Sequence, residues 1–491
     1  MRVLLIYANR ARDLVPAPPI GLAYVATATR DAGHDVRFLD LLPSADPDAD
    51  LRRALAEFKP EAIGISVRNI DNVVHQHLAR HLGELARLIA LLRAHSAAPI
   101  VVGGPAISIL GASTLKHLDA DIAVIGEGER SFPALLAALE SGTSLGGVDG
   151  ICYRAGGQIR SNPPARLAAF GASGMEQWID WRAYERFGGT WAVQTKRGCP
   201  LACSYCAYPA IEGEGLRRRP AAEVVDEIER VAAVARPRSF EFVDSTFNVP
   251  ARHALDICRE IIRRKLKLRF TAMGVNPLTA SAELFALMKQ AGFNSVMITP
   301  EAGNDAMLDN LNKGFSMRHV RRTAKLVRAA GLRSTWFFML GGPGETRATV
   351  EETLGFVERE LTGSRFLSIF MTGIRILPGT ALADQARGDG HLRADQDLAE
   401  SAFYFSTAVS EAWMLERINA AIRRHNNIVH AAEENGSGLE RLFNRVLRLA
   451  GVAPPYWRFL PLLLSIPPLP TLRRRRPTVG GGARRRALQN P

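Results

Sequence analysis

Short apolar runs alternate with helical stretches over residues 1–165. The runs are Val3–Tyr7, Val36–Leu39, Ala62–Val67, Ile100–Gly103 and Ile122–Ile125. Between them, Gly21–Ala32 is predicted to be a helix closed by Gly33, and Gln76–Ala94 a longer helix. Strands that alternate with helices are typical of a doubly wound parallel sheet. We therefore expect an N-terminal Rossmann-like α/β domain at residues 1–165.

A second α/β region is predicted at residues 189–385, after a linker of weak periodicity at residues 166–188. Its apolar runs are Trp191–Gln194, Phe240–Val243, Leu268–Ala272, Ser295–Thr299, Ser334–Leu340 and Leu367–Ile376. Amphipathic stretches separate them, and one places Val350, Leu354 and Val357 on a single apolar face. Six strand–helix units indicate an open, partial (β/α)6 barrel, whose chemistry lies at the carboxyl ends of its strands.

Residues 386–460 are predicted to form a mainly helical C-terminal domain, with Ala402–Ile428 as the clearest helical stretch. Residues 461–491 form a basic tail. The net charge is +13, yet eight arginines and no acidic residue lie between Val452 and Pro491. A basic tail among prolines and glycines is more typical of a disordered extension than of a nucleic-acid-binding module. We expect no nucleic-acid partner, although contact of the tail with an acidic partner, anionic lipid or RNA stays open.

The composition is that of a soluble globular enzyme of more than one domain. The chain has 491 residues, 47% of them hydrophobic and 23% charged. Five cysteines are present, and three of them fall within eight residues, which favours a metal site over a disulfide framework. The sequence does not begin with a signal peptide, and no apolar run reaches the ~20 residues of a membrane span. We expect a cytoplasmic protein without a transmembrane segment.

Three loops at predicted strand ends in the first domain carry unusual residues. Ligands of doubly wound sheets bind beyond the carboxyl ends of the strands. No G-x-G-x-x-G follows the first strand, which counts against NAD or FAD. Glycines at several strand ends indicate a broad flat ligand close to the backbone, with ordinary tight turns as the alternative. The candidate binding residues are Arg68, Asn69, Gly103, Gly104, Pro105, Gly126, Glu127 and Gly128.

The cysteine cluster follows the first strand of the second domain. Cys199, Cys203 and Cys206 form a C-x3-C-x2-C motif. Three thiolates at this spacing can each bind a different iron of a cubane cluster and leave the fourth iron open. Structural zinc would need a fourth ligand, and the nearest histidine, His253, is far along the chain. The motif therefore predicts an iron–sulfur cluster.

This motif, with Tyr205 before the last cysteine, resembles that of radical S-adenosylmethionine (SAM) enzymes. With the preceding Rossmann-like domain, the chain is similar to their cobalamin-dependent class, and the tryptophan-methyltransferase-like branch is one option. The resemblance implies a [4Fe-4S] cluster, cobalamin and SAM as cofactors, a small-molecule substrate, and an electron donor such as flavodoxin or ferredoxin. It also implies that SAM contacts Asp244, Ser245, Glu301, Gly303 and Gly342.

Two further residues are candidates for catalysis. The D-x-H-x-x-G motif that supplies a lower cobalt ligand is absent, and Arg68 could instead face the lower side of the corrin. The alternative is that Arg68 pairs with Asp71 or points into solvent. In the tryptophan-methylating branch a second-strand carboxylate can occupy the open iron, and Glu241 matches it. Strand alternation puts Glu241 and Asp244 on opposite faces, so only one of them points into the barrel.

The function implied by the resemblance is cobalamin- and SAM-dependent methyl transfer to a carbon, less often a phosphorus, of a small molecule in specialised metabolism. Indole or tryptophan is one candidate substrate. The alternatives are a cobalamin-binding radical SAM enzyme that catalyses a cyclisation or rearrangement, and a non-catalytic protein that binds a cluster and a corrinoid.

Overall fold

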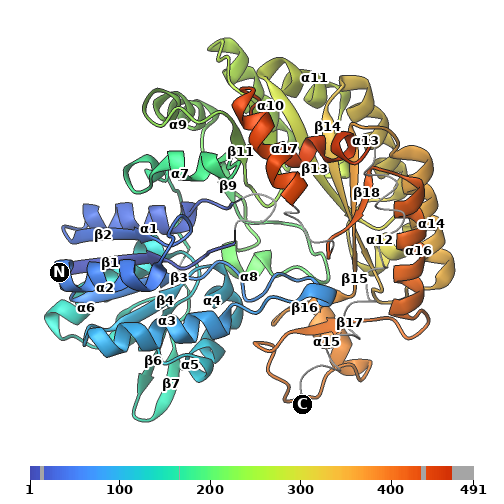
Figure 1. Ribbon diagram of the computed structural model, residues 1–491. Helices are drawn as coiled ribbons and strands as arrows, with labels where there is room; N and C mark the ends of the chain where they lie inside the picture. The colour runs from blue at the N-terminus through green and yellow to red at the C-terminus, as the bar shows by residue number, and fades with distance from the viewer. Residues whose placement is uncertain (12–15, 165, 433–437, 467–491) are drawn as a thin grey trace.

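The computed structural model describes residues 1–11, 16–164, 166–432 and 438–466. Figure 1 shows two α/β parts side by side, with the N-terminal part in blue and cyan and the larger C-terminal part in green to red. Helix α8 (Tyr208–Glu212) of the second part contacts α4 (Pro105–Leu110) of the first. The segment 467–491, which holds most of the predicted basic tail, lies outside the described residues.

The N-terminal part is a seven-stranded sheet in the order β2-β1-β3-β4-β5-β6-β7, in which the first five strands are parallel. This order is that of doubly wound folds, whose ligands bind where the strand order reverses, here between β1 and β3. The strands are β1 (Arg2–Tyr7), β2 (Asp35–Asp40), β3 (Ala62–Ser66), β4 (Ile100–Gly103), β5 (Ile122–Val124), β6 (Ile151–Ala155) and β7 (Gln158–Ser161). All five predicted strands are present. The apolar residues of β1, β3, β4 and β5 are buried on both faces of the sheet, whereas those of the edge strand β2 are half-buried.

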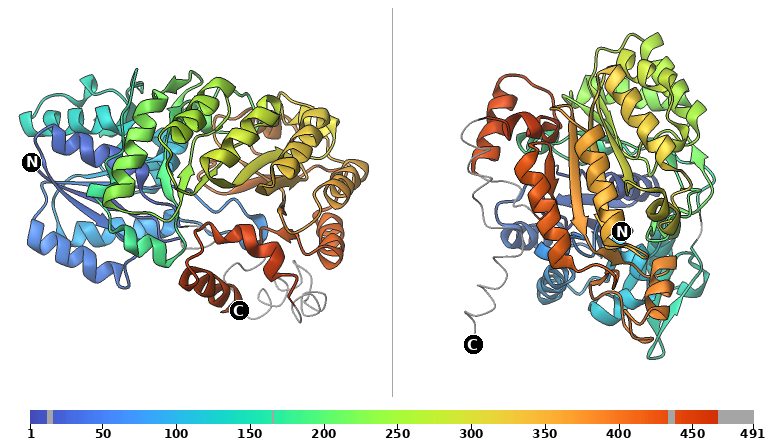
Figure 2. Two further views of the ribbon diagram at one scale, coloured as in Figure 1. Left: turned by 90° about the horizontal axis from the view of Figure 1, so that it is seen from above. Right: turned by 90° about the vertical axis from the view of Figure 1, so that its right-hand side faces the viewer.

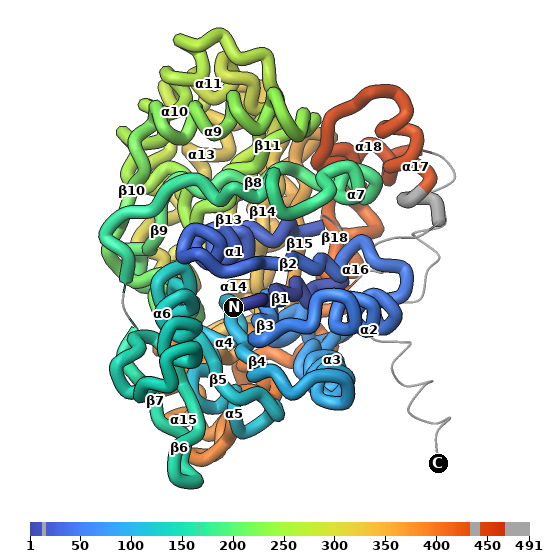
Figure 3. The backbone as a smooth tube through the Cα atoms, turned by 90° about the vertical axis from the view of Figure 1, so that its left-hand side faces the viewer, coloured from blue at the N-terminus to red at the C-terminus, as the bar shows by residue number. Residues whose placement is uncertain are grey.

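Helices cover both faces of this sheet, as Figure 3 shows from the side of the N-terminal part. On one face Leu5 packs with α1 and α6, and on the other Leu4 packs with α2 and α3. The helices are α1 (Ile20–Asp31), α2 (Pro47–Phe58), α3 (Leu82–His95), α4, α5 (Thr114–His117) and α6 (Gly128–Ser141). The prediction of a helix from Gln76 was wrong, because α3 begins at Leu82. The residues before it form a loop in which Gln76 hydrogen-bonds to Glu411 of the second part at 2.5 Å.

The second part is a parallel sheet of seven strands in the order β18-β15-β14-β13-β12-β11-β8. Six strands match the predicted runs: β8 (Trp191–Val193), β11 (Phe240–Phe242), β12 (Phe270–Ala272), β13 (Phe293–Glu301), β14 (Arg333–Leu340) and β15 (Phe366–Thr372). The outer helices include α9 (Ala221–Val234), α10 (Ala251–Arg263), α11 (Ala282–Ala291), α12 (Asp305–Asn310), α13 (Met317–Ala330) and α14 (Arg347–Glu360). Two short strands, β9 (Lys196–Arg197) and β10 (Arg217–Arg218), flank the cysteine loop.

The C-terminal region is mainly helical, but it also completes the barrel sheet. The predicted helical stretch 402–428 instead holds β17 (Ala402–Tyr404), which pairs with β16 (Ile374–Ile376), and then α16 (Glu411–Arg424). Strand β18 (Ile428–His430) follows and pairs with β15. The remaining elements are α15 (Ala381–Gly388), α17 (Gly438–Leu449), the 3-10 helix η6 (Tyr456–Phe459) and α18 (Leu460–Leu463). Figure 2 shows these last segments in red on one side of the barrel.

The predicted linker 166–188 is packed against both parts. It contains η4 (Met175–Gln177) and α7 (Trp181–Arg186), and the side chain of Trp181 is buried. The Tyr184 hydroxyl donates to Asp40 of β2 at 2.7 Å. The linker therefore helps to fix the first sheet relative to the barrel.

Candidate functional site

A cavity of about 680 Å³ lies between the two parts. The N-terminal part contributes the ends of β1, β3, β4 and β5, and the barrel contributes β8, β11 and the inward faces of β13 to β15. In the N-terminal part these are the carboxyl ends of the parallel strands, as predicted. In the barrel the cavity runs along the inward face of the sheet, from Leu367 near the start of β15 to Met371 near its end. The predicted residues that line it are Arg68, Gly103, Gly104, Pro105, Gly126, Glu127, Gly128 and Glu241.

Glycine at position 104 is required by the turn that ends β4. Its φ is +101°, and a Cβ there would lie 2.7 Å from the Val67 carbonyl oxygen. The next residue, Pro105, begins α4. Because Gly103 and Gly104 carry no side chains, the cavity wall here is bare backbone. Asn69, which was predicted to bind with Arg68, is exposed and does not line the cavity.

Glu127 joins the two parts. Its carboxylate forms an ion pair with Arg217 and lies 3.7 Å from Arg197, and it accepts a hydrogen bond from the Leu167 amide at 2.7 Å. Glu129 in the same loop pairs with Arg197 at 2.5 Å. The glycine-rich loop after β5 is thus tied to the residues directly before the cysteine loop.

The cysteine loop follows β9 and is held by backbone contacts. Gly198 has φ +91°, and a Cβ there would lie 2.1 Å from the Gly215 carbonyl oxygen. The Cys199 amide donates to the Gly213 carbonyl at 3.0 Å, and the Cys206 amide donates to the Cys203 carbonyl at 3.1 Å. All three cysteines are free thiols.

Cys199 is buried, and Cys203 and Cys206 are half-buried. Burial raises the pKa of Cys206 to about 11 and also raises the pKa of Cys203. A thiolate must form before either residue can bind a metal. A bound metal ion would supply the positive charge that stabilises the thiolate forms of these two half-buried cysteines.

Glu301 lies beside the cysteine loop, at the end of β13, with φ +70°. Its Oε1 accepts a hydrogen bond from the Tyr205 hydroxyl at 3.1 Å and lies 3.8 Å from Lys313 Nζ. Lys313 also donates to the Tyr205 hydroxyl at 2.9 Å. Burial raises the pKa of Glu301, while Lys313 opposes the shift, and the charge of Glu301 acts in turn on Cys203. The carboxylate expected to hold the SAM ribose is therefore adjacent to the thiols.

Glu241 points into the cavity, which settles the question that strand alternation left open. Its Oε2 accepts a hydrogen bond from the Thr190 hydroxyl at 2.7 Å. Burial raises its pKa, and the positive charge of Arg68 opposes the shift, so the two side chains act on one another across the cavity. Asp71, the alternative partner for Arg68, is instead engaged with Arg375 at 2.7 Å. Among the described residues Arg68 forms no ion pair.

Asp244 faces away from the cavity and is fully engaged. It pairs with Lys196 at 2.9 Å, and both side chains are 0% exposed. It also accepts hydrogen bonds from the Thr195 amide at 2.7 Å and the Thr195 hydroxyl at 2.6 Å. The neighbouring Ser245 hydroxyl donates to the Gly198 carbonyl at 3.0 Å. Both residues, expected at SAM, hold the start of the cysteine loop in this structure.

The two glycines expected near adenosine have close neighbours. A Cβ on Gly303 would lie 2.7 Å from Thr353 Cα of α14, and one on Gly342 would lie 2.9 Å from Ile374 Cδ1. Both positions therefore permit close packing of the strand ends against their neighbours.

Comparison with known proteins identifies the family. Residues 193–357 match the radical SAM superfamily, and residues 9–136 match the B12 binding domain. The chain is a cobalamin-dependent radical SAM protein. The two matches coincide with the barrel and with the N-terminal sheet, which are the two parts that enclose the cavity.

Relatives of this cobalamin-dependent radical SAM protein align over most of the chain. An uncharacterized methyltransferase of Pyrococcus horikoshii is 27% identical over 351 residues, which is 70% of this chain and 73% of the relative. Tryptophan 2-C-methyltransferase of Streptomyces laurentii is 26% identical over 449 residues, 78% of this chain and 74% of the relative. An anaerobic magnesium-protoporphyrin IX monomethyl ester cyclase of Synechocystis is 27% identical over 330 residues, 65% of this chain and 64% of the relative.

A solved structure has the same fold. The radical SAM methyltransferase TsrM from Kitasatospora setae, with cobalamin and a [4Fe-4S] cluster bound, superimposes with a TM-score of 0.81 at 23% identity. The match covers 96% of this chain and 99% of that one. It shows that the sheet orders and the placement of the two parts are those of a known architecture.

The residues present fit the cofactors of the family. Three free thiols in one loop are the donor set of a site-differentiated iron–sulfur cluster. The bare backbone at Gly103 and Gly104, together with the cation of Arg68, suits a broad corrin ring. Sequence reasoning missed Thr190 and Lys313, which position Glu241 and Glu301; no local pattern marks either one, because their partners are distant in the sequence.

Proposed function

We propose that this protein transfers a methyl group from SAM to a carbon centre of a small molecule, with cobalamin as methyl carrier. The observation that carries the proposal is the cavity lined by both the B12-binding loops and the inward face of the barrel sheet. A site built this way holds two cofactors and a substrate in one enclosed space, where orientation and exclusion of water favour group transfer.

The chain's own residues have distinct parts in this proposal. The cluster, SAM and cobalamin supply the methyl-transfer chemistry when bound. Cys199, Cys203 and Cys206 would hold the cluster, and Glu301 would accept hydrogen bonds from SAM beside it. Arg68 would face the corrin as a fixed cation. Glu241, whose pKa is raised by burial, would accept or hold a proton at a group that enters the cavity.

An electron-rich aromatic carbon, such as that of an indole, is the first substrate class to test. The barrel side of the cavity is apolar, with Met273, Met297, Phe337 and Leu367 among its lining residues. One relative acts on tryptophan. A low-potential donor such as flavodoxin or ferredoxin would reduce the cofactors, and the free cysteines suit the reducing cytoplasm. Within the described part of the chain, no helix has the length and apolar character to cross a membrane.

The test is anaerobic reconstitution with iron, sulfide and hydroxocobalamin. We expect about four irons and one cobalamin per chain, with iron lost and cobalamin kept in a Cys199→Ala/Cys203→Ala/Cys206→Ala variant. Incubation with methyl-labelled SAM and indole derivatives should then transfer label to the acceptor. If the reconstituted protein binds iron but no cobalamin, the proposal that cobalamin carries the methyl group is refuted.

The second candidate is a cyclisation or rearrangement, which the match to the cyclase of Synechocystis favours. The same incubation separates the two functions. Formation of 5′-deoxyadenosine without transfer of label to any acceptor would support the second candidate and refute methyl transfer.

A further inference from the structure

The amino ends of five successive barrel strands carry cationic or amide side chains. Parallel strands begin at the same edge of a sheet, so these side chains gather at the end of the barrel opposite the cysteine loop. Arg238 lies just before β11, Arg269 before β12, Asn294 at the second residue of β13, Arg333 at the start of β14 and Arg365 before β15.

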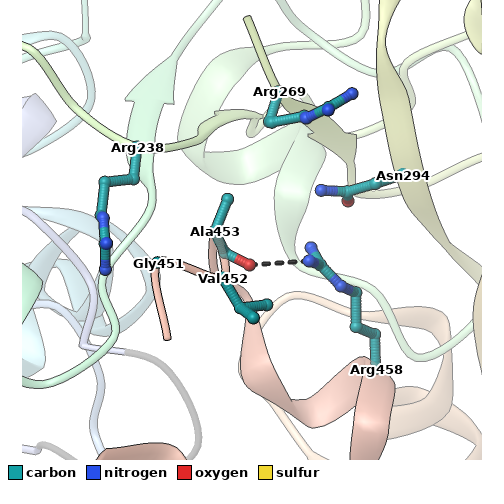
Figure 4. A pocket seen from close by; sticks show the side chains of 7 residues that line it. All are labelled: Arg238, Arg269, Asn294, Gly451, Val452, Ala453 and Arg458. Carbon is teal, nitrogen blue, oxygen red and sulfur yellow. Dashed lines mark hydrogen bonds between the residues drawn. The ribbon is translucent and has the colours of Figure 1, made fainter. Parts of the chain in front are cut away.

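The C-terminal segment closes over this end of the barrel. Figure 4 shows the guanidinium groups of Arg238, Arg269 and Arg458 and the amide of Asn294 around a hollow, with Ala453 beside them. This hollow has a volume of about 550 Å³, and a second of about 350 Å³ adjoins it. The two share Arg269, Asn294 and Arg458, and the second adds Lys289, Arg333 and Arg365.

The cluster carries positive charge, and no carboxylate pairs with its guanidinium groups among the described residues. The Glu185 carboxylate accepts a hydrogen bond from the backbone amide of Arg238 at 3.1 Å but forms no ion pair with its guanidinium. No aspartate or glutamate lines either hollow, and within residues 1–11, 16–164, 166–432 and 438–466 none of its five arginines forms an ion pair. Arg458 is only 8% exposed, and burial together with Arg333 lowers its pKa to about 10. A cation this well buried without a countercharge is costly.

Arg238, Arg333 and Arg458 donate hydrogen bonds to backbone carbonyls, which supply no countercharge. Arg458 donates to the carbonyls of Ala453 at 2.7 Å and Pro454 at 3.1 Å. Arg238 and Arg333 also donate to carbonyl oxygens. The Nδ2 of Asn294 is buried without a partner among the described residues. Donors therefore remain available for an anion.

We propose that these two hollows form a binding site for a small oligophosphate anion, free or as the phosphate tail of a nucleotide. Guanidinium groups bind phosphate oxygens in pairs through charge-assisted hydrogen bonds. Two adjoining hollows with shared arginines suit at least two linked phosphate groups better than one. The proposal does not depend on the proposed methyl transfer.

The site is coupled to the central cavity through η6. Arg458 lines the hollow, while its neighbour Trp457 and the nearby Leu460 line the cavity between the two parts. An anion that binds Arg458 would fix η6 and thereby the wall of the cavity. The site lies at the end of the barrel away from the thiols, so a ligand bound there would reach the central cavity only through η6.

The experiment titrates the full cofactor-free chain with orthophosphate, pyrophosphate, tripolyphosphate and ADP by isothermal calorimetry, at an ionic strength fixed with chloride. We expect saturable binding of pyrophosphate, and at least tenfold weaker affinity in Arg269→Gln, since a charge-assisted hydrogen bond contributes ~1.5–3 kcal/mol. Arg318→Gln removes an exposed arginine of α13 outside the hollows and should bind like the wild type.

Tighter binding of ADP than of pyrophosphate would identify the ligand as a nucleotide, and equal binding would identify an inorganic oligophosphate; both support the site. The proposal is overturned if none of the four anions binds saturably, or if Arg269→Gln binds pyrophosphate as tightly as Arg318→Gln. Circular dichroism of both variants checks that the exposed Arg269 side chain is not needed for folding.

Discussion

Replacing Lys196 by methionine should strongly destabilise the barrel. Lys196 Nζ lies 2.9 Å from Asp244 Oδ2, and both side chains are 0% exposed. Methionine keeps most of the volume but leaves the buried carboxylate without its cation, which costs about 3–5 kcal/mol. The hydrogen bonds from Thr195 to the carboxylate remain, so we expect the lower end of this range, about 3 kcal/mol. Guanidinium unfolding of the cofactor-free chain measures the loss.

The matched controls are Asp244→Asn and the double variant with both changes. The asparagine side chain would keep an acceptor for the Thr195 amide, so the double variant should recover all but about 1 kcal/mol of the loss, since no charge then remains buried. If Asp244 bound SAM instead, Asp244→Asn would weaken SAM binding and leave the free energy of unfolding unchanged. A Lys196→Met loss below about 1 kcal/mol would likewise refute the reasoning.

Three further predictions concern the turn after β14, the cysteine loop and the domain contact. Burial raises the pKa of Glu345 from 4.5 to about 7, so ionisation of this carboxyl opposes folding. The free energy of unfolding should therefore be highest below pH 4.5 and should fall as the pH rises to 7. Glu345→Gln should remove this slope, gaining at most about 3 kcal/mol over the wild type by pH 7.5 in unfolding titrations. Gly198→Ala should lose iron on reconstitution because its Cβ would clash with Gly215, whereas Gly215→Ala, which has open space, should keep it. Arg197→Gln breaks the ion pair with Glu129, so the variant should retain less cobalamin on gel filtration. Unchanged iron and cobalamin contents would show that this ion pair does not connect the two cofactor sites.

Five strands of the first sheet and six of the second could be predicted because each is a short run rich in apolar residues, and the thiols because their spacing is local. The antiparallel strands β6 and β7 were not predicted. The strand β18 could not be predicted, since its three residues, Ile428 to His430, gain their conformation from pairing with β15. The start of α3 was misplaced for the same reason: Gln76 is held by Glu411, a residue far along the chain. Neither contact can be predicted from the local sequence.

The choice between Glu241 and Asp244 also lay beyond the sequence. Both faces of a parallel barrel strand are buried, so hydrophobicity does not distinguish the inward face. The residues that contact each carboxylate determine which one faces the cavity. Lys196 neutralises Asp244 on one side of the strand. Among the described residues Glu241 accepts a hydrogen bond only from the Thr190 hydroxyl, so its carboxylate can still accept hydrogen bonds from a ligand in the cavity.

One set of contacts between the two parts connects the corrin-side loop with the cysteine loop. Glu127 and Glu129 belong to the loop of the B12-binding sheet, and Arg197, which pairs with Glu129, is two residues before Cys199. Arg197 also stacks on Tyr24 of α1, 4.6 Å from its ring centre. A shift of the corrin-side loop therefore acts directly on the strand that carries the cysteine loop. In this architecture the ion pairs of Glu127 and Glu129 act together with the packed linker 166–188 to set the distance between the two cofactor sites.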